Sequence, residues 1–311
     1  MRLKKFYACI RILLQQQTGQ ELKMTIFANG MGGGIGRFLW PPLEKLGAVR
    51  IASRLGSSTL VHDLKNPPAQ DKVHFAKGDI LIFLAALSKP GDCARNPREA
   101  WRINVENTGA LIERALSAGA RVLFFSSDTV YGNQDGPLDE SASLKAEEPY
   151  GRMKAAVETR FCRTAGFTAL RLSYVVSPAD GVTTYLQECA RTGNIAEVFA
   201  EYARNMIGVE DVVEAVLTLT RLAQTGCPLP PAVNLAGKSC VTRLEMAKAY
   251  RDAVAPNLSV REIPAPDGFF SVRPKKISLD VSLLTSLMQR SPHLLTEVYR
   301  NAILKGELQN D

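Results

Sequence analysis

The chain has 311 residues, of which 46% are hydrophobic and 22% are charged, so it can bury a substantial core and is not wholly disordered. Its net charge of +7 comes from scattered basic residues without interleaved aromatics, which argues against nucleic-acid binding and suits an anionic small substrate. The six cysteines and three histidines show no disulfide or metal-ligand spacing. We therefore expect reduced thiols, a cytoplasmic location and no metal.

Residues 1–23 begin with basic residues and then become apolar, as a signal peptide would. Arg11 interrupts the apolar part, and a glutamine tract without a small-residue cleavage site follows. No run of about 20 apolar residues occurs anywhere in the chain, so we expect no membrane span. We interpret 1–23 as an N-terminal extension, with Met24 as a candidate for the natural start.

The first predicted strand, 25–29, leads directly into a glycine-rich turn and then a helix at 37–47. Gly30, Gly33 and Gly36 form G-x-x-G-x-x-G, in which the three glycines allow a tight turn, close approach to a pyrophosphate and helix–strand packing. The helix N-terminus supplies N–H groups to phosphates. We expect this turn, including Gly34 and Ile35, to bind a dinucleotide; a plain loop is the alternative.

The second predicted strand, 48–53, bears on which dinucleotide binds. An NAD site places an acid near the end of this strand, whereas a basic residue suits the 2′-phosphate of NADP. Here Ser53 and Arg54 follow, with no acid. NADP is therefore favoured over NAD, unless Arg54 is only a solvated loop arginine. Further on, we expect Asp63 and its neighbour Leu64 to lie near the adenine.

Apolar strands and helices continue to alternate along the chain. We predict strands at 79–87, 121–127 and 168–176, and helices at 97–118 and 147–166. This pattern predicts an α/β fold, a doubly wound parallel sheet covered by helices on both faces. We expect a Rossmann domain at 24–172. The less regular 173–311 is interpreted as a smaller α/β domain, mainly substrate-binding, that returns once to the sheet.

The strongest chemical signal is "PYGRMK", in which Tyr150 and Lys154 lie four residues apart on one helix face. A neighbouring ammonium, together with an oxidised nicotinamide, favours the phenolate and brings the tyrosine pKa towards the working range. Ser127 ends a predicted strand at the carboxyl edge of the sheet, where ligands bind. We therefore predict Ser127, Tyr150 and Lys154 as the catalytic set.

With these motifs in place, the chain resembles the extended short-chain dehydrogenase/reductases, the nucleotide-sugar epimerase, dehydratase and reductase group. The resemblance runs from about Met24 to Leu284 and includes "HDL", "LAAL", "SSDTVYG" and "NMIGVEDVVEAV". It implies that Asp63, Leu64, Ala85 and Ala86 lie beside the cofactor and that Asn104 is structural. It also implies that Arg204 and Arg273 bind a substrate diphosphate, although either could be a surface arginine.

Within this group, the motifs favour one reaction but do not exclude the others. Dehydratases that resemble this pattern carry an Asp-Glu pair where this chain has Asp128 and Thr129, so dehydration is disfavoured. The Ser127-Asp128 pair and the late "RP" segment resemble dTDP-4-dehydrorhamnose reductases, which implies reduction of a 4-keto nucleotide sugar with NADPH. A C4 epimerase with bound NAD and a non-catalytic regulatory member remain alternatives. Relatives commonly form homodimers, so a homodimer is possible.

Overall fold

A computed structural model describes residues 24–54, 59–68 and 72–305 of the chain. The predicted N-terminal extension, 1–23, lies outside these described residues. Within them, no helix is both long enough and apolar enough to cross a membrane.

A seven-stranded parallel sheet forms the centre of the molecule, with strand order β11-β6-β5-β4-β1-β2-β3. Its strands are β1 (Ile26–Asn29), β2 (Val49–Ala52), β3 (Thr59–Val61), β4 (Ile80–Phe83), β5 (Arg121–Ser127), β6 (Phe167–Leu172) and β11 (Ala232–Leu235). The strand order reverses between β1 and β4, which makes a crevice at their carboxyl ends. The glycine turn follows β1 and therefore lies at this crevice.

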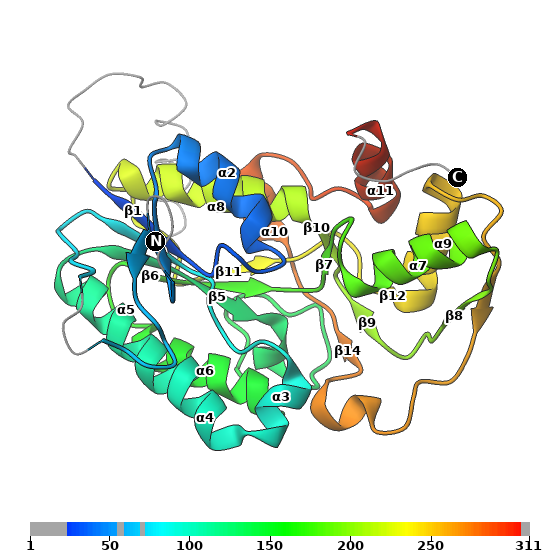
Figure 1. Ribbon diagram of the computed structural model, residues 1–311, viewed down its shortest axis with the longest axis horizontal. Helices are drawn as coiled ribbons and strands as arrows, with labels where there is room; N and C mark the ends of the chain where they lie inside the picture. Colours follow the sequence, from blue (N-terminus) through cyan, green and yellow to red (C-terminus); the bar gives the residue numbers. More distant parts are fainter. Residues whose placement is uncertain (1–23, 55–58, 69–71, 306–311) are drawn as a thin grey trace.

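Helices cover both faces of the sheet, as Figure 1 shows. One face carries α2 (Gly36–Lys45), α8 (Val209–Gln224) and α10 (Ser282–Met288), whose apolar residues share a core with the sheet. The other face carries α3 (Pro90–Arg95), α4 (Pro97–Trp101), a π-helical segment (Arg102–Asn107), α5 (Thr108–Ser117) and α6 (Pro149–Phe161). The predicted doubly wound α/β fold is confirmed.

Most of the chain after β6 forms a smaller region at one end of the sheet (Figure 1). Its helices are α7 (Gly181–Thr192), α9 (Arg243–Ala253) and α11 (Leu295–Leu304), which share a separate apolar core. Its short strands are β7 (Val175–Val176), β8 (Ala196–Val198), β9 (Ala203–Arg204), β10 (Ile207–Gly208), β12 (Val241–Thr242), β13 (Val260–Glu262) and β14 (Lys276–Ile277). A 3-10 turn, η3 (Phe269–Val272), lies in this region, and another, η2 (Asp128–Tyr131), follows β5 in the first half. Among the described residues after β6, only strand β11 returns to the main sheet.

Several predicted elements differ from the observed ones at their ends. The strand predicted at 79–87 stops at Phe83, because Asn29 Oδ1 accepts the next backbone N–H groups, those of Leu84 and Ala85. The helix predicted at 97–118 contains the π-helical segment, and α3 precedes it unpredicted. The strand predicted at 168–176 breaks after β6, because β7 leaves the main sheet to pair with β10.

Candidate active site

The glycine turn joins β1 to α2, and its glycines meet different surroundings. A Cβ on Gly30, whose φ is +74°, would lie 2.6 Å from the Ala85 backbone nitrogen, and one on Gly36 would lie 2.3 Å from the Gly30 oxygen. Packing within the protein therefore requires glycine at both positions. A Cβ on Gly33 would approach the Gly30 oxygen only to 3.4 Å, and one on Gly34 would meet nothing within 4 Å. The outer side of the turn is thus open.

The turn also presents free backbone donors at the start of α2. Among the described residues, the N–H groups of Gly34 and Ile35 have no hydrogen-bond partner. No side chain caps α2, and its first turn contains no acid. Free N–H groups at a helix N-terminus attract a phosphate, and an acid there would repel it. The open turn and its donors therefore fit the pyrophosphate of a dinucleotide.

Two arginines, one within β2 and one just after it, lie at the side of the crevice where β2 ends. Arg54 is exposed just beyond the strand. Arg50, within β2, places its guanidinium 5.5 Å from the centre of the Trp40 ring. Its Nη2 is 3.2 Å from where a Cβ on Gly32 would lie, so Arg50 touches the glycine turn. The sequence reasoning overlooked Arg50, although an arginine inside an apolar strand was a usable signal.

The other residues predicted to bind cofactor lie in loops at the same carboxyl edge of the sheet. Asp63 follows β3 and accepts the Lys65 N–H at 2.9 Å, while the carbonyl oxygen of Leu64 accepts a bond from Asn107 Nδ2 at 2.7 Å. Ala85 and Ala86 follow β4 and are half-buried. The contact between Gly30 and Ala85 places the loop after β4 against the glycine turn.

Asn104 supports the loop after β4 from the π-helical segment. Its Oδ1 accepts the Leu87 N–H and its Nδ2 donates to the Leu87 oxygen, each at 2.9 Å. Both ends of the amide are therefore used to fix the backbone of that loop. This geometry supports the structural role that the resemblance implies for Asn104.

Ser127 and Tyr150 line one cavity of about 170 Å³, beside the carboxyl ends of β5 and β6. Ser127 is the last residue of β5, and Tyr150 is the second residue of α6. The lining also includes Tyr202, Arg204 and Arg273, from the second half of the chain. The structure thus brings together two of the three predicted catalytic residues and both predicted diphosphate-binding arginines.

Lys154 lies one helical turn beyond Tyr150 and is buried. Its Nζ donates to the Phe125 oxygen at 2.7 Å and lies 4.5 Å from the centre of the Phe124 ring and 5.8 Å from that of Tyr150. Burial lowers the pKa of Lys154 to about 7, although the charge of Glu158 opposes this. In the protein without cofactor, the Lys154 side chain is therefore mainly charged below about pH 7 and mainly neutral above it.

Burial also controls the tyrosine. It raises the pKa of Tyr150 far above the usual value, and nearby Cys93 and Asp128 raise it further. In the protein without cofactor, burial therefore dominates the pKa of Tyr150. The expectation that Lys154 and an oxidised nicotinamide together bring this pKa down stays a prediction. Tyr150 is a protonated phenol at neutral pH, the form that donates a proton.

The two predicted diphosphate-binding arginines have different surroundings. Arg204 is fully buried; its Nη1 donates to the oxygens of Ala203 and Lys275, and its Nη2 donates to that of Pro274. Its Nε lies 3.3 Å from Asp128 Oδ2. The alternative of a surface arginine is wrong for Arg204, and its nitrogens are largely committed to the protein.

Arg273, in contrast, is half-buried and has one weak contact, from Nη1 to the Phe269 oxygen at 3.4 Å. Its guanidinium also lies 4.7 Å from the centre of the Phe269 ring. Arg243, which sequence reasoning missed, stacks within 5.0 Å of the ring centres of Phe199, Tyr202 and Phe269. Tyr202 and Arg273, which line the cavity, therefore belong to a cluster of aromatic rings and arginines.

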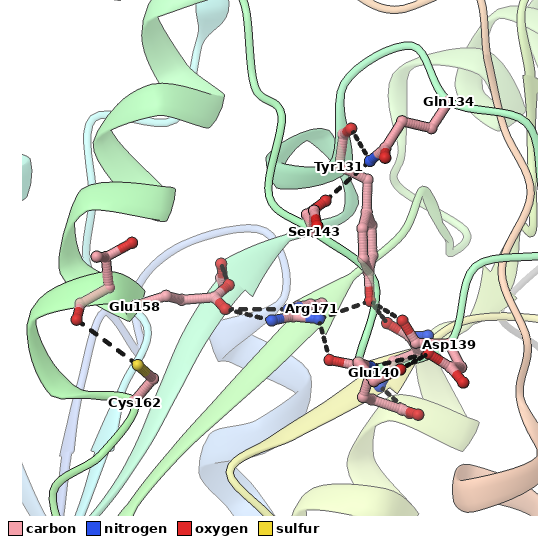
Figure 2. A network of polar contacts seen from close by, with 12 residues as sticks. Tyr131, Gln134, Asp139, Glu140, Ser143, Glu158, Cys162 and Arg171 are labelled. Carbon is pink, nitrogen blue, oxygen red and sulfur yellow. Dashed lines mark hydrogen bonds and ion pairs between the residues drawn. The ribbon is translucent and has the colours of Figure 1, made fainter.

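A buried polar network lies behind α6, as Figure 2 shows. Arg171 of β6 pairs with Glu158 of α6 at 2.8 Å and donates to the Tyr131 hydroxyl at 2.7 Å. Tyr131 in turn donates to Asn234 of β11 at 2.7 Å. The network fixes α6, the helix that carries Tyr150 and Lys154, against β6, η2 and β11.

Comparison with known proteins gives one family and several relatives. Residues 26–236 match the model described as NAD dependent epimerase/dehydratase family. The chain is 26% identical over 233 residues to methionine adenosyltransferase 2 subunit beta of Rattus norvegicus, covering 71% of this chain and 69% of that protein. It is also 26% identical over 235 residues to dTDP-4-dehydrorhamnose reductase of Mycolicibacterium smegmatis, covering 74% and 69%. A crystal structure of UDP-galactose 4-epimerase superposes with a TM-score of 0.69 at 26% identity, covering 91% of this chain and 99% of the other.

Proposed function

The chain belongs to the NAD dependent epimerase/dehydratase family and is an NAD(P)-dependent enzyme of the extended short-chain dehydrogenase/reductase type, and we propose that it reduces a 4-keto nucleotide sugar with NADPH. The observation that carries this proposal is the cavity that Ser127, Tyr150 and Arg273 line together. A protonated phenol beside a hydroxyl suits a carbonyl oxygen, and the arginine suits a diphosphate.

In the proposed reaction, each residue acts on a stated atom. Tyr150 gives its proton to the carbonyl oxygen, and Ser127 holds that oxygen by a hydrogen bond. Lys154 hydrogen-bonds the ribose of the nicotinamide, while Arg273 holds the substrate diphosphate. The cofactor supplies the hydride when it is bound at the glycine turn. The raised pKa of Tyr150 keeps the phenol protonated, the form that gives a proton to a carbonyl oxygen.

The preference for NADPH rests on the surroundings of β2. No acid ends this strand, and Arg54 follows it, exposed. Arg50, stacked on Trp40 and touching the glycine turn, adds a second positive charge at the same edge. Arginine forms strong bonds to phosphate, so both residues support binding of a 2′-phosphate.

The experiment uses dTDP-4-dehydrorhamnose and NADPH and follows the oxidation of NADPH. We expect turnover by the wild-type protein and a loss of roughly 10²- to 10⁴-fold in kcat for Tyr150→Phe, which removes only the acidic proton. Tyr185→Phe is the matched control, because that tyrosine is exposed and outside the cavity. Unchanged activity in Tyr150→Phe would refute its role.

A C4 epimerase is a second candidate, supported by the likeness to UDP-galactose 4-epimerase. An epimerase regenerates its cofactor within each turnover, whereas a reductase consumes it. Interconversion of UDP-glucose and UDP-galactose by purified protein carrying bound NAD, without added cofactor, would replace the reductase proposal.

A third candidate is a role as a subunit of another enzyme, supported by the likeness to methionine adenosyltransferase 2 subunit beta. A subunit role alone would leave Tyr150→Phe without effect on any activity of the assembly. Co-purification of a stoichiometric partner, together with no oxidation of NADPH, would favour this candidate.

A further inference from the structure

Glu148 is a second acid in the cavity that the sequence did not indicate. It is the residue before α6, two positions from Tyr150, and it lines the cavity with Ser127 and Tyr150. Only 7% of its surface is exposed. The resemblance to dehydratases leads one to look for an acid at position 129, where this chain has threonine. Glu148 places a carboxyl beside Thr129 from a different element.

The surroundings of Glu148 Oε1 indicate that the carboxyl holds a proton. Among the described residues, Oε1 is buried and has no hydrogen-bond partner. A Cβ built on Gly151 would lie 2.5 Å from Oε1 and 2.8 Å from the Thr129 carbonyl oxygen, which already accepts the Gly132 N–H at 3.1 Å. A buried carboxylate oxygen without a donor is costly, and a proton on the carboxyl relieves this cost.

The charges around Glu148 agree with a neutral carboxyl. Burial raises the pKa of Glu148, and the charge of Asp128 raises it further, whereas bonds from the Thr129 side chain and from backbone N–H groups lower it. Neither of the cavity's two arginines is among the groups that lower the pKa of Glu148, and Arg204 pairs with Asp128 instead. Glu148 thus combines a raised pKa with access to the cavity, as proton-transfer residues do.

Hydroxyl groups connect this carboxyl to the place where a carbonyl oxygen is expected. The Thr129 hydroxyl interacts with the Glu148 carboxyl, and its one proton goes to Ser127 Oγ at 3.0 Å, so it can only accept a proton from Glu148. Ser127 Oγ donates to Asp128 Oδ1 at 3.3 Å and would turn from it to donate to a substrate oxygen. The order Glu148, Thr129, Ser127 is then a continuous route into the cavity.

We propose that Glu148 is a proton-relay residue that supplies, through Thr129 and Ser127, the proton that the reduction consumes. This inference rests on the proposed reductase function. Tyr150 first gives its proton to the substrate oxygen and becomes a phenolate. A proton then passes from Glu148 to Thr129, from Thr129 to Ser127 and from Ser127 to the product oxygen, which returns one proton to Tyr150. The net loss is one proton from Glu148, which solvent water replaces.

The first test measures the pH dependence of NADPH oxidation with dTDP-4-dehydrorhamnose. Wild-type kcat falls as pH rises through the pKa of Glu148, because the deprotonated carboxylate has no proton to supply. We expect Glu148→Gln to lower kcat roughly 10- to 100-fold with little change in KM, and to abolish this pH dependence. Thr129→Val should reproduce both effects, and Thr129→Ser should restore the wild-type profile. The exposed neighbour provides the control, Glu147→Gln, which should behave as wild type.

The second test requires no turnover. The infrared difference spectrum between wild type and Glu148→Gln at neutral pH should contain the C=O band of a protonated carboxyl. Absence of this band overturns the relay whatever the activity, as does a wild-type pH profile in Glu148→Gln or in Thr129→Val. If the band is present but no NADPH is oxidised, the proposed function is contradicted. The relay is then contradicted as well, because there is no reduction that consumes its proton.

Discussion

At the scale of single residues, the two predicted diphosphate-binding arginines differ in how many of their donors are already used. Arg204 donates from its terminal nitrogens to three backbone oxygens, and its buried Nε lies 3.3 Å from Asp128 Oδ2 as an ion pair without a hydrogen bond. Within the described part of the chain, Arg273 lines the cavity and makes only the weak bond to the Phe269 oxygen. The first arginine therefore holds β9 against the segment before β14, and the second is the better candidate to bind a ligand.

This difference predicts that two matched substitutions change different properties, the free energy of unfolding in one case and KM in the other. Arg204→Met should lower the free energy of unfolding by about 3–5 kcal/mol, because it leaves Asp128 buried without its charged partner. Arg273→Met should leave unfolding nearly unchanged but raise KM for the nucleotide sugar about 10- to 100-fold, since charge-assisted bonds to a diphosphate are lost. Urea unfolding and initial-rate measurements check the pair. Equal effects on stability would contradict the assignment.

Contacts between residues that lie far apart in the sequence could not be predicted from the sequence. Tyr150 and Lys154 were predicted because four-residue spacing on a helix fixes their common face. Glu148 was missed because nothing in the sequence shows that its side chain turns towards Thr129, and Asn29 was missed because its contacts lie 55 and 56 residues away. Patterns within one element were predictable, whereas contacts between elements were not.

At the scale of elements, the glycine turn separates positions required for folding from positions open to a ligand. Gly30 and Gly36 pack against backbone, whereas Gly33 and Gly34 border open space. The strand before the turn and the helix after it were predicted correctly from the apolar runs. The early end of β4 and the π-helical segment were not, since both depend on contacts that local patterns do not carry.

Two alanine substitutions test this separation. Gly36→Ala places a methyl group 2.3 Å from the Gly30 oxygen, so we expect a loss of about 1–3 kcal/mol or more in the free energy of unfolding. Gly33→Ala should unfold almost as wild type does, yet bind NADPH more weakly, because its methyl group occupies the open side of the turn. Thermal unfolding with and without NADPH measures both effects. An undiminished shift with NADPH in Gly33→Ala would argue against a pyrophosphate at this turn.

At the scale of the whole molecule, both halves of the chain contribute to one cavity. We propose that 24–172 binds the cofactor and that 173–311 mainly binds substrate, because Tyr150 comes from the first part and Arg273 from the second. The network of Figure 2 spans the same boundary, through Arg171 and Tyr131 to Asn234. Buried networks of this kind fix the relative positions of the elements they join.

The central claim, reduction of a sugar carbonyl, is tested most directly by following the hydride. Wild-type protein is incubated with dTDP-4-dehydrorhamnose and NADPH in which both hydrogens at nicotinamide C4 are deuterium, and the product is examined by mass spectrometry and NMR. The account predicts one deuterium on C4 of the product sugar, with one NADPH oxidised per product molecule. A sugar product formed without deuterium, or without oxidation of NADPH, would contradict it.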